Sequence, residues 1–513
     1  MKKREKSAFL TAIVNLYYFI IASFLPFVVR TLLIQYIGIE FVGIKGLFES
    51  ILQLFNIVNL GADASFFSYF LFKPCEDKNY NFINAIMGFI KKIYLALSGI
   101  TLFIGLIAIP FLPYLVNNNK YPNGLNIYYI FIIYVIHNSM GYIIGLLSMA
   151  YRPLLLEHIA SFTYGTSFVI MYIIQILLII YTKNFALYTT ALLVSDLFMI
   201  IFFYSYNRNR LSWLTYKGKL PEGFMADFKK RIIPMFVSKI RNISRNSIDS
   251  IIISHFMGLA ILAQYQNYYQ IVMIPLMLIG ILNSAIQPAL GNGISVETPE
   301  SNYGVLKQFT FIQNFAVTVC TTCLITLIQP FIKLWLGTQF LLGMDVVVCV
   351  GIYFYVLSIA DIGIILRNTT GTWENGMWVA VVESLLNLIL NIILIRVLGL
   401  WGIILASVVT VAFINIPFEL KYVFKHYFLK NYHNFIYMII RNTLITTIIT
   451  LLSFFICMHF EITSYRMAFI RCLMAVIMPT LLFIIFHHND EEYDKMKSLI
   501  IQIVQNSINK IQR

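Results

Sequence analysis

Charged side chains are scarce in this sequence of 513 residues. They make up 12% of the chain, whereas hydrophobic residues make up 59%. A soluble globular domain carries about 25% charged residues. So much apolar surface must be covered by lipid or by other membrane helices. The shortage of charge therefore excludes a soluble protein and leaves no room for a separate soluble domain.

Cysteine is also sparse, with six residues, and its placement predicts no metal or redox site. Cys320 and Cys323 share a C-x-x-C spacing, but they lie in an apolar run without a polar neighbour that would lower a thiol pKa. The cysteines have no flanking histidine or second pair to complete a zinc site. We interpret them as small buried residues and expect no metal and no cofactor.

Long apolar runs fill the rest of the chain. A membrane-spanning helix needs roughly 20 apolar residues, and fourteen runs of about that length or longer can be found. They lie at 8–36, 42–71, 88–116, 127–150, 159–181, 185–206, 232–257, 265–290, 309–331, 343–366, 376–397, 400–420, 435–459 and 466–487. The sequence therefore predicts an all-α, polytopic membrane protein of about fourteen transmembrane helices. The first run is too long for a signal-peptide core and lacks a cleavage site, so we expect an uncleaved first span.

The basic residues predict the orientation. With both termini cytoplasmic, the inner segments hold 25 Lys and Arg residues and the outer loops hold only five. Cytoplasmic loops of membrane proteins carry such an excess. The pattern explains most of the net charge of +14 without a nucleic-acid partner.

The longest inner connection, 207–231, is basic and divides the first twelve spans into two sets of six. We therefore predict a six-helix bundle over 1–206, a cytoplasmic linker over 207–231 and a second six-helix bundle over 232–433. Helices 13 and 14 would occupy 434–487. Apolar residues at helical spacing predict an amphipathic cytoplasmic tail over 488–513.

Seven basic residues remain inside or near the ends of spans, and each would cost about 2.5–3.5 kcal/mol at the bilayer centre. Arg441 and Arg471 lie close to span ends, from which they can reach the interface. The other five are Arg30, Lys45, Lys239, Arg241 and Arg245. They fall on polar faces of the first, second and seventh spans.

Other polar residues recur on the same faces at helical spacing. They are Gln53, Asn56, Asn242 and Asn246, with the carboxylates Glu49, Asp63 and Asp249. Lys45 with Glu49, and Arg245 with Asp249, are also i,i+4 pairs that could simply neutralise one another. Five cations against three carboxylates nevertheless leave an excess of positive charge. We favour a hydrated, cationic cavity between the two bundles, whose ligand is an anion or an amphiphile with an anionic head.

Several strings, taken in order, resemble the Wzx-type polysaccharide flippases of the multidrug/oligosaccharidyl-lipid/polysaccharide exporter superfamily. In the first half these are Gly38-Ile-Glu-Phe-Val-Gly-Ile-Lys-Gly-Leu-Phe, Asn59-Leu-Gly-Ala-Asp, Phe72-Lys-Pro and Lys91-Lys-Ile-Tyr. In the second half they are Ser247-Ile-Asp-Ser-Ile-Ile-Ile-Ser, Tyr265-Gln-Asn-Tyr, Gln287-Pro-Ala-Leu-Gly-Asn, Phe331-Ile-Lys-Leu-Trp-Leu-Gly and Arg367-Asn-Thr-Thr-Gly. The similarity extends through about twelve spans.

The resemblance implies a flippase of the bacterial cytoplasmic (inner) membrane. Its cargo would be an undecaprenyl-diphosphate-linked oligosaccharide for O-antigen, capsule or exopolysaccharide, and its partners would be membrane lipids and the polymerase and glycosyltransferases of the same pathway. In this hypothesis the five cations bind the diphosphate, and the Asn and Gln side chains contact sugars. Glu49, Asp63 and Asp249 would serve in gating or in coupling to H⁺ or Na⁺.

Two alternatives remain. One is a cation-coupled exporter of small amphiphiles or drugs on the same fold, which the excess of positive charge disfavours. The other is a membrane transferase or polymerase. Short outer loops, and the lack of a His/Asp or paired-carboxylate motif near an interface, argue against an enzyme.

Overall fold

The protein is described from a computed structural model, which covers residues 3–55, 64–116, 121–122, 124–220, 222–370, 377–460, 465–498 and 505. These residues form sixteen α-helices and no β-strand. The helices of the first half are α1 (Lys3–Tyr36), α2 (Ile39–Phe55), α3 (Ala64–Glu76), α4 (Tyr80–Ala108), α5 (Ile127–Ser148), α6 (Glu157–Thr182), α7 (Phe185–Arg210) and α8 (Phe224–Met257). Those of the second half are α9 (Leu259–Val296), α10 (Pro299–Trp335), α11 (Met344–Thr370), α12 (Met377–Leu398), α13 (Leu400–Thr410), α14 (Ile416–Val423), α15 (His433–Met458) and α16 (Tyr465–His487). The all-α prediction is confirmed for this part of the chain.

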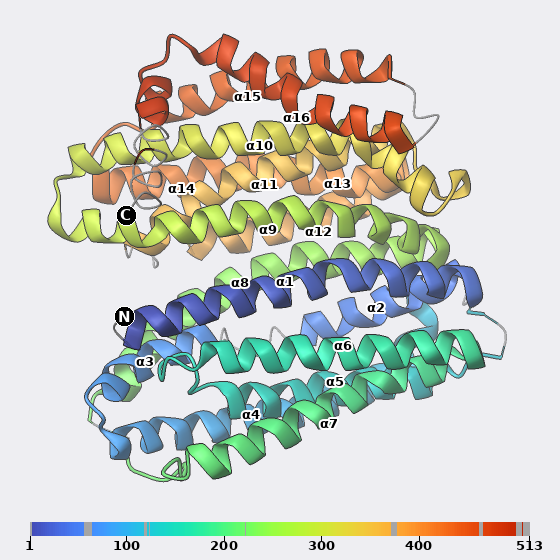
Figure 1. The fold of residues 1–513 in the computed structure, drawn as a ribbon, viewed down its shortest axis with the longest axis vertical. Helices are drawn as coiled ribbons and strands as arrows, with labels where there is room; N and C mark the ends of the chain where they lie inside the picture. Colours follow the sequence, from blue (N-terminus) through green and yellow to red (C-terminus); the bar gives the residue numbers. More distant parts are fainter. Residues whose placement is uncertain are drawn as a thin grey trace. The chain divides into compact units, whose positions relative to one another are not determined.

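The chain divides into two compact units, Met1–Ala263 and Gln264–Arg513. In each unit long helices run side by side (Figure 1). In unit 1, α1 packs against α6, α5 packs against α4 and α7, and α2 packs against α8. Contacts thus group α8 with the first unit, whereas the sequence analysis places it in the second bundle. The predicted domain boundaries stay predictions.

Eleven helical segments among the described residues are long and apolar enough to cross a membrane. Each matches one of the fourteen predicted spans. The other three predicted spans fall on α2 with α3, on α8 and on α9. Helix α2 has only 17 residues, and the short apolar part of α8 is Ser247–Met257. The protein is therefore an integral membrane protein, and the number fourteen stays a prediction.

Asparagine side chains begin several of the helices. Asn79, Asn126 and Asn184 accept hydrogen bonds from the first free backbone N–H groups of α4, α5 and α7. Such caps satisfy donors that have no partner inside the helix. Gly258, with φ +89°, separates α8 from α9 in a conformation that other residues adopt only with strain.

Pairs of small hydroxyl residues join neighbouring spans. Ser98 on α4 meets Ser139 on α5 at 2.7 Å, and Ser167 on α6 meets Ser195 on α7 at 2.7 Å. In unit 2, Thr318 on α10 meets Thr446 on α15 at 2.8 Å. Small side chains allow the helices to approach closely, and their hydroxyl groups bond across the contact. These pairs show why Ser and Thr recur within otherwise apolar runs.

The predicted linker 207–231 is held against unit 1. The buried Asn84 side chain of α4 donates to the Trp213 carbonyl at 2.9 Å and accepts from the Thr215 and Tyr216 amides at 2.6 and 3.1 Å. The Trp213 ring also packs on Tyr80, with 4.6 Å between ring centroids. The segment after α7 is thus part of the packed unit.

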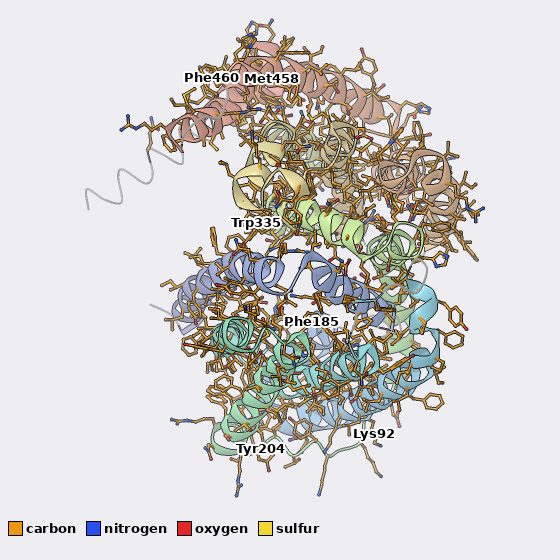
Figure 2. The ribbon with its side chains drawn as sticks, turned by 90° about the vertical axis from the view of Figure 1, so that its right-hand side faces the viewer. Lys92, Phe185, Tyr204, Trp335, Met458 and Phe460 are labelled. Atoms are coloured by element: carbon orange, nitrogen blue, oxygen red, sulfur yellow. The ribbon has the colours of Figure 1, made fainter. Side chains whose placement is uncertain are left out.

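Side chains in unit 1 are sorted by position. Phe185 lies among the helices, whereas Lys92 and Tyr204 lie at the periphery (Figure 2). Phe185 is 2% exposed, and the Tyr204 side chain is 59% exposed. An exposed aromatic on a long apolar helix is typical of a surface that faces lipid or its interface.

In unit 2, α15 and α16 pack against each other and against α10. Arg441 on α15 forms two hydrogen bonds with the Asp490 carboxylate, at 2.7 and 3.2 Å, just after α16 ends. Of the predicted amphipathic tail, residues 491–498 are helical. Residues 499–504 and 506–513 lie outside the described residues.

Candidate functional site: a cationic polar face in unit 1

Helix α2 has one polar face and one apolar face. Lys45, Glu49 and Gln53 follow one another at four-residue steps, and Lys45 Nζ lies 3.9 Å from Glu49 Oε1. The Lys45 and Glu49 side chains are 32% and 53% exposed. Residues on the other face are at most 4% exposed: Ile44, Leu47, Phe48, Ile51 and Leu52. Charged groups need water or an ionic partner, and here Lys45 and Glu49 are ionic partners of each other on a partly exposed face.

Arg30 on α1 adds a second cation to this face. Helix α1 packs against α2, and the Arg30 guanidinium lies within electrostatic reach of both Glu49 and Lys45. Arg30 and Lys45 are therefore both close enough to Glu49 to be attracted by its carboxylate. Arg30, Lys45 and Glu49 thus lie together in the structure.

Helix α8 packs beside α2. The Ser247 hydroxyl donates to Gln53 Oε1 at 2.9 Å, so the turn of α8 around Ser247 lies against the turn of α2 around Gln53. Arg245 and Asp249 lie two residues to either side of Ser247, roughly 200° around the helix, so the contact with Gln53 does not place their side chains on α2. Asp249 is 3% exposed. The roles assigned to Arg245 and Asp249 stay predictions.

Close packing supports this arrangement at the start of α2. A Cβ added to Gly43 would lie 2.2 Å from the Leu259 carbonyl oxygen. Only glycine lets the two backbones approach so closely. Gly43 lies two residues before Lys45, and its contact with Leu259 holds this part of α2 against the start of α9.

Other predicted site residues have a partial description. Lys239, Arg241, Asn242 and Asn246 belong to α8, but their side chains are not among those described. Asn56 and Asp63 lie outside the described residues. The roles assigned to these six residues stay predictions.

Three tyrosines that the sequence analysis did not single out surround the charges. They come from three helices: Tyr134 from α5, Tyr172 from α6 and Tyr188 from α7. Lys45 and Glu49 lie within electrostatic reach of Tyr172, and Glu49 also of Tyr134. In the sequence, a tyrosine within an apolar run looks like any other aromatic residue of the core. Only the folded structure shows that these three tyrosines lie near Lys45 and Glu49.

Two of these tyrosines have hydroxyl groups with unused hydrogen-bonding capacity. Tyr134 and Tyr188 are 2% and 1% exposed, and no described residue hydrogen-bonds to either hydroxyl. Buried polar atoms in folded proteins are nearly always bonded to protein, water or ligand. These hydroxyls can donate to an acceptor that enters the site.

Residues elsewhere also test the sequence analysis. Asp196, Asp361 and Glu383 are isolated ionisable residues within apolar runs, a pattern that favours hydrogen bonds between helices, and each forms one. His137 Nδ1 lies 2.7 Å from Asp196, Asn283 donates to Asp361 at 3.4 Å, and Asn415 donates to Glu383 at 2.7 Å. No group of three His, Cys, Asp or Glu residues that could hold a metal ion occurs among the described residues.

Arg367 has a different role from the one its position in the sequence suggests. It follows a predicted span, where basic residues normally only mark topology. In the structure its side chain is 3% exposed and Nη1 lies 2.6 Å from Oε1 of Glu419, which is 1% exposed. The partner lies 52 residues away, after a π-helical turn at Val411–Asn415. Arg367 is therefore part of a buried ion pair that joins α11 to α14.

Comparison with solved structures identifies the fold. No family model and no curated protein sequence matches the chain. The structure of the lipid II flippase MurJ in an inward closed conformation is similar with a TM-score of 0.66 and 15% identity, covering 94% of this chain and 99% of that one. An inward-facing multidrug resistance MATE family transporter of the MOP superfamily is similar with a TM-score of 0.61 and 12% identity, covering 77% and 93%. An outward-facing MATE family transporter gives a TM-score of 0.54 at 13% identity, covering 82% and 96%. The chain has the fold of MOP-superfamily transporters.

Proposed function

We propose that the protein is a flippase that moves an undecaprenyl-diphosphate-linked oligosaccharide from the cytoplasmic to the outer leaflet of a bacterial inner membrane. The observation that carries the proposal is the polar face of unit 1, where Arg30 and Lys45 lie near Glu49. A net positive, hydrated surface within membrane helices favours an anionic group.

Such a cargo needs a polar surface on which its head can cross the membrane. A diphosphate and several sugars cannot enter hydrocarbon, because each desolvated hydroxyl or charge costs several kcal/mol. The polar face replaces bulk water around the head, while the polyprenyl tail stays in lipid. Arg30, Lys45 and Arg245 attract the diphosphate, and Gln53 with the Tyr134 and Tyr188 hydroxyls offers hydrogen bonds to oxygens of the head.

The carboxylates complete the cycle in this proposal. Glu49 and Asp249 hold the cations when cargo is absent and release them when the diphosphate arrives. Alternating access then exposes the site to one side of the membrane at a time, with H⁺ or Na⁺ as the coupling ion. The glycan would be delivered to the polymerase that builds O-antigen, capsule or exopolysaccharide.

Export of small amphiphiles or drugs is the second candidate, since MATE family transporters have the same fold. The two functions predict cargoes of opposite charge. An anionic cargo gains from Arg30 and Lys45, whereas a cationic drug would depend on Glu49 and Asp249.

Transport by the purified chain in liposomes separates the two functions. We expect a lipid-linked oligosaccharide diphosphate to become accessible in the opposite leaflet, measured by cleavage of its head with an enzyme added outside. We expect no transport of a fluorescent lipophilic cation by the same vesicles. Transport of the cation alone would favour the drug exporter and overturn the flippase proposal.

A further inference from the structure

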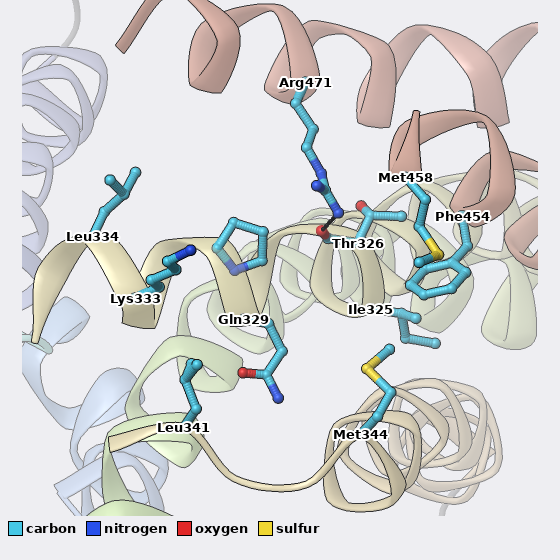
Figure 3. A pocket seen from close by; sticks show the side chains of 11 residues that line it. Ile325, Thr326, Gln329, Lys333, Leu334, Leu341, Met344, Phe454, Met458 and Arg471 are labelled. Carbon is cyan, nitrogen blue, oxygen red and sulfur yellow. Dashed lines mark hydrogen bonds between the residues drawn. The ribbon is translucent and has the colours of Figure 1, made fainter. Parts of the chain in front are cut away.

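A pocket of about 430 Å³ lies in unit 2. It is formed near the end of α10, by the chain that leads into α11, and by α15 and α16 (Figure 3). Much of its wall is apolar, with Leu334, Met344 and Phe454 among the lining residues. Two cations, Lys333 and Arg471, also line it. In the predicted topology this end of unit 2 faces the outer side of the membrane.

Pro330 explains why Arg471 is held in the pocket. A proline has no N–H, so the carbonyl four residues earlier in α10, that of Thr326, lacks its usual helical donor. Arg471 Nη2 donates to this carbonyl at 3.1 Å, and Nη1 donates to the Phe460 carbonyl at 3.4 Å. Figure 3 shows the Arg471 side chain extending from α16 to Thr326. Both acceptors are neutral, so they orient the guanidinium without cancelling its charge.

Lys333 supplies the second positive charge, three residues after Pro330 in the last turn of α10. Within the described ranges, no ion pair joins Lys333 or Arg471 to a carboxylate. An anion in the pocket would therefore interact with both charges. A guanidinium with orienting contacts and a nearby ammonium group are the donors that phosphate groups prefer.

A hydrogen-bond network fixes the wall opposite Arg471. Gln329 donates to the Leu342 carbonyl at 2.6 Å and accepts from the Tyr268 hydroxyl at 3.2 Å. The Leu342 amide donates to the same hydroxyl at 2.9 Å. Gln329 and Tyr268 thus hold the segment before α11 against α10, so the pocket is formed in advance of any ligand.

The exposed faces of α15 and α16 beside the pocket are apolar and suited to contact with acyl chains. On α15, Leu451 and Phe455 are 52% and 60% exposed, and on α16, Phe469 and Leu473 are 66% and 44% exposed. Apolar side chains on membrane helices contact lipid tails. A ligand with a phosphate head and apolar chains would use the cations and this surface together, whereas free phosphate would use only the cations.

We propose that this pocket binds the phosphate headgroup of an anionic phospholipid, with Lys333 and Arg471 contacting the head and the exposed faces of α15 and α16 contacting the acyl chains. None of the residues that line the pocket belongs to the cargo site proposed in unit 1. Occupancy of the pocket between α10, α15 and α16 would then depend on the lipid composition of one leaflet.

Native mass spectrometry of the full chain tests the proposal with phosphatidylglycerol as the probe. The wild-type protein should retain phosphatidylglycerol in preference to phosphatidylcholine. The Lys333→Gln variant should bind phosphatidylglycerol about ten-fold more weakly, which corresponds to a loss of about 1.4 kcal/mol in binding free energy. Lys333 makes no hydrogen bond within the described ranges, so this variant should fold normally. Arg471→Gln should have a similar effect, and the matched control Arg466→Gln, on the exposed start of α16, should have none.

Three results would overturn the proposal. One is equal retention of phosphatidylglycerol by wild-type and Lys333→Gln protein. Another is binding of inorganic phosphate as tight as that of the lipid, which would make the pocket a site for a soluble anion. The third is an effect of Lys333→Gln on polyprenyl monophosphate but not on phosphatidylglycerol, which would identify a different lipid as its ligand.

Discussion

Replacing Arg30 by Gln is expected to lower translocation of a lipid-linked diphosphate by about 10- to 100-fold. Hydrogen bonds to charged groups contribute about 1.5–3 kcal/mol, and a factor of ten corresponds to about 1.4 kcal/mol. The substitution also removes one of the two cations described near Glu49 on α1 and α2, so the local positive charge is reduced. The initial rate of head exposure in proteoliposomes measures the effect.

Two variants make this measurement specific. Arg30→Lys keeps the charge and should retain part of the activity, although it loses the planar donor geometry. Lys92→Gln removes an exposed cation of α4 at the periphery of unit 1 and should transport at the wild-type rate. Full activity of Arg30→Gln would contradict the assignment of the cargo site. Arg245→Ala on α8 is expected to abolish transport in the same way while leaving the protein in the membrane.

Replacing Arg367 by Gln is expected to destabilise unit 2 by about 3–5 kcal/mol, because it leaves the Glu419 carboxylate buried without its ionic partner. Thermal unfolding of the detergent-solubilised protein measures the loss. Gly363 on α11 leaves space for this pair, since an added Cβ would lie 3.2 Å from Glu419 Cβ. The ion pair therefore depends on close packing of α11 and α14.

The double variant Arg367→Met with Glu419→Met should recover most of the lost stability, because an apolar pair of similar volume has no buried charge. Removing the exposed pair of Lys430 and Glu300, 3.5 Å apart, should change stability by less than about 1 kcal/mol. Wild-type stability of Arg367→Gln, or a double variant less stable than either single one, would contradict this role.

The helices could be predicted from the sequence because lipid imposes a simple rule. Apolar runs of about 20 residues must form helices to satisfy their backbone, and the described part of each predicted run is mostly helical. The polar face of α2 could also be predicted, because Lys45, Glu49 and Gln53 follow its four-residue repeat. Local periodicity carries this information directly.

Partners that lie far apart in the chain could not be predicted. Glu419 is 52 residues from Arg367, and Ser247 is 194 residues from Gln53. Tyr134 and Tyr188 gain their place in the site only through the packing of α5 and α7. The position of α8 in unit 1 likewise depends on contacts with α2, which a break in composition at 207–231 does not reveal.

The central claim is that the site in unit 1 selects a negative charge, and the Glu49→Gln variant tests it most directly. The measurement is equilibrium binding of a lipid-linked diphosphate and of a lipophilic cation to wild-type and variant protein at matched ionic strength. Removing the carboxylate near Arg30 and Lys45 should tighten binding of the diphosphate several-fold. Neither the wild-type protein nor the variant should bind the lipophilic cation measurably. Weaker binding of the diphosphate, together with loss of a measurable affinity for the cation, would contradict the account and identify a site for positively charged cargo.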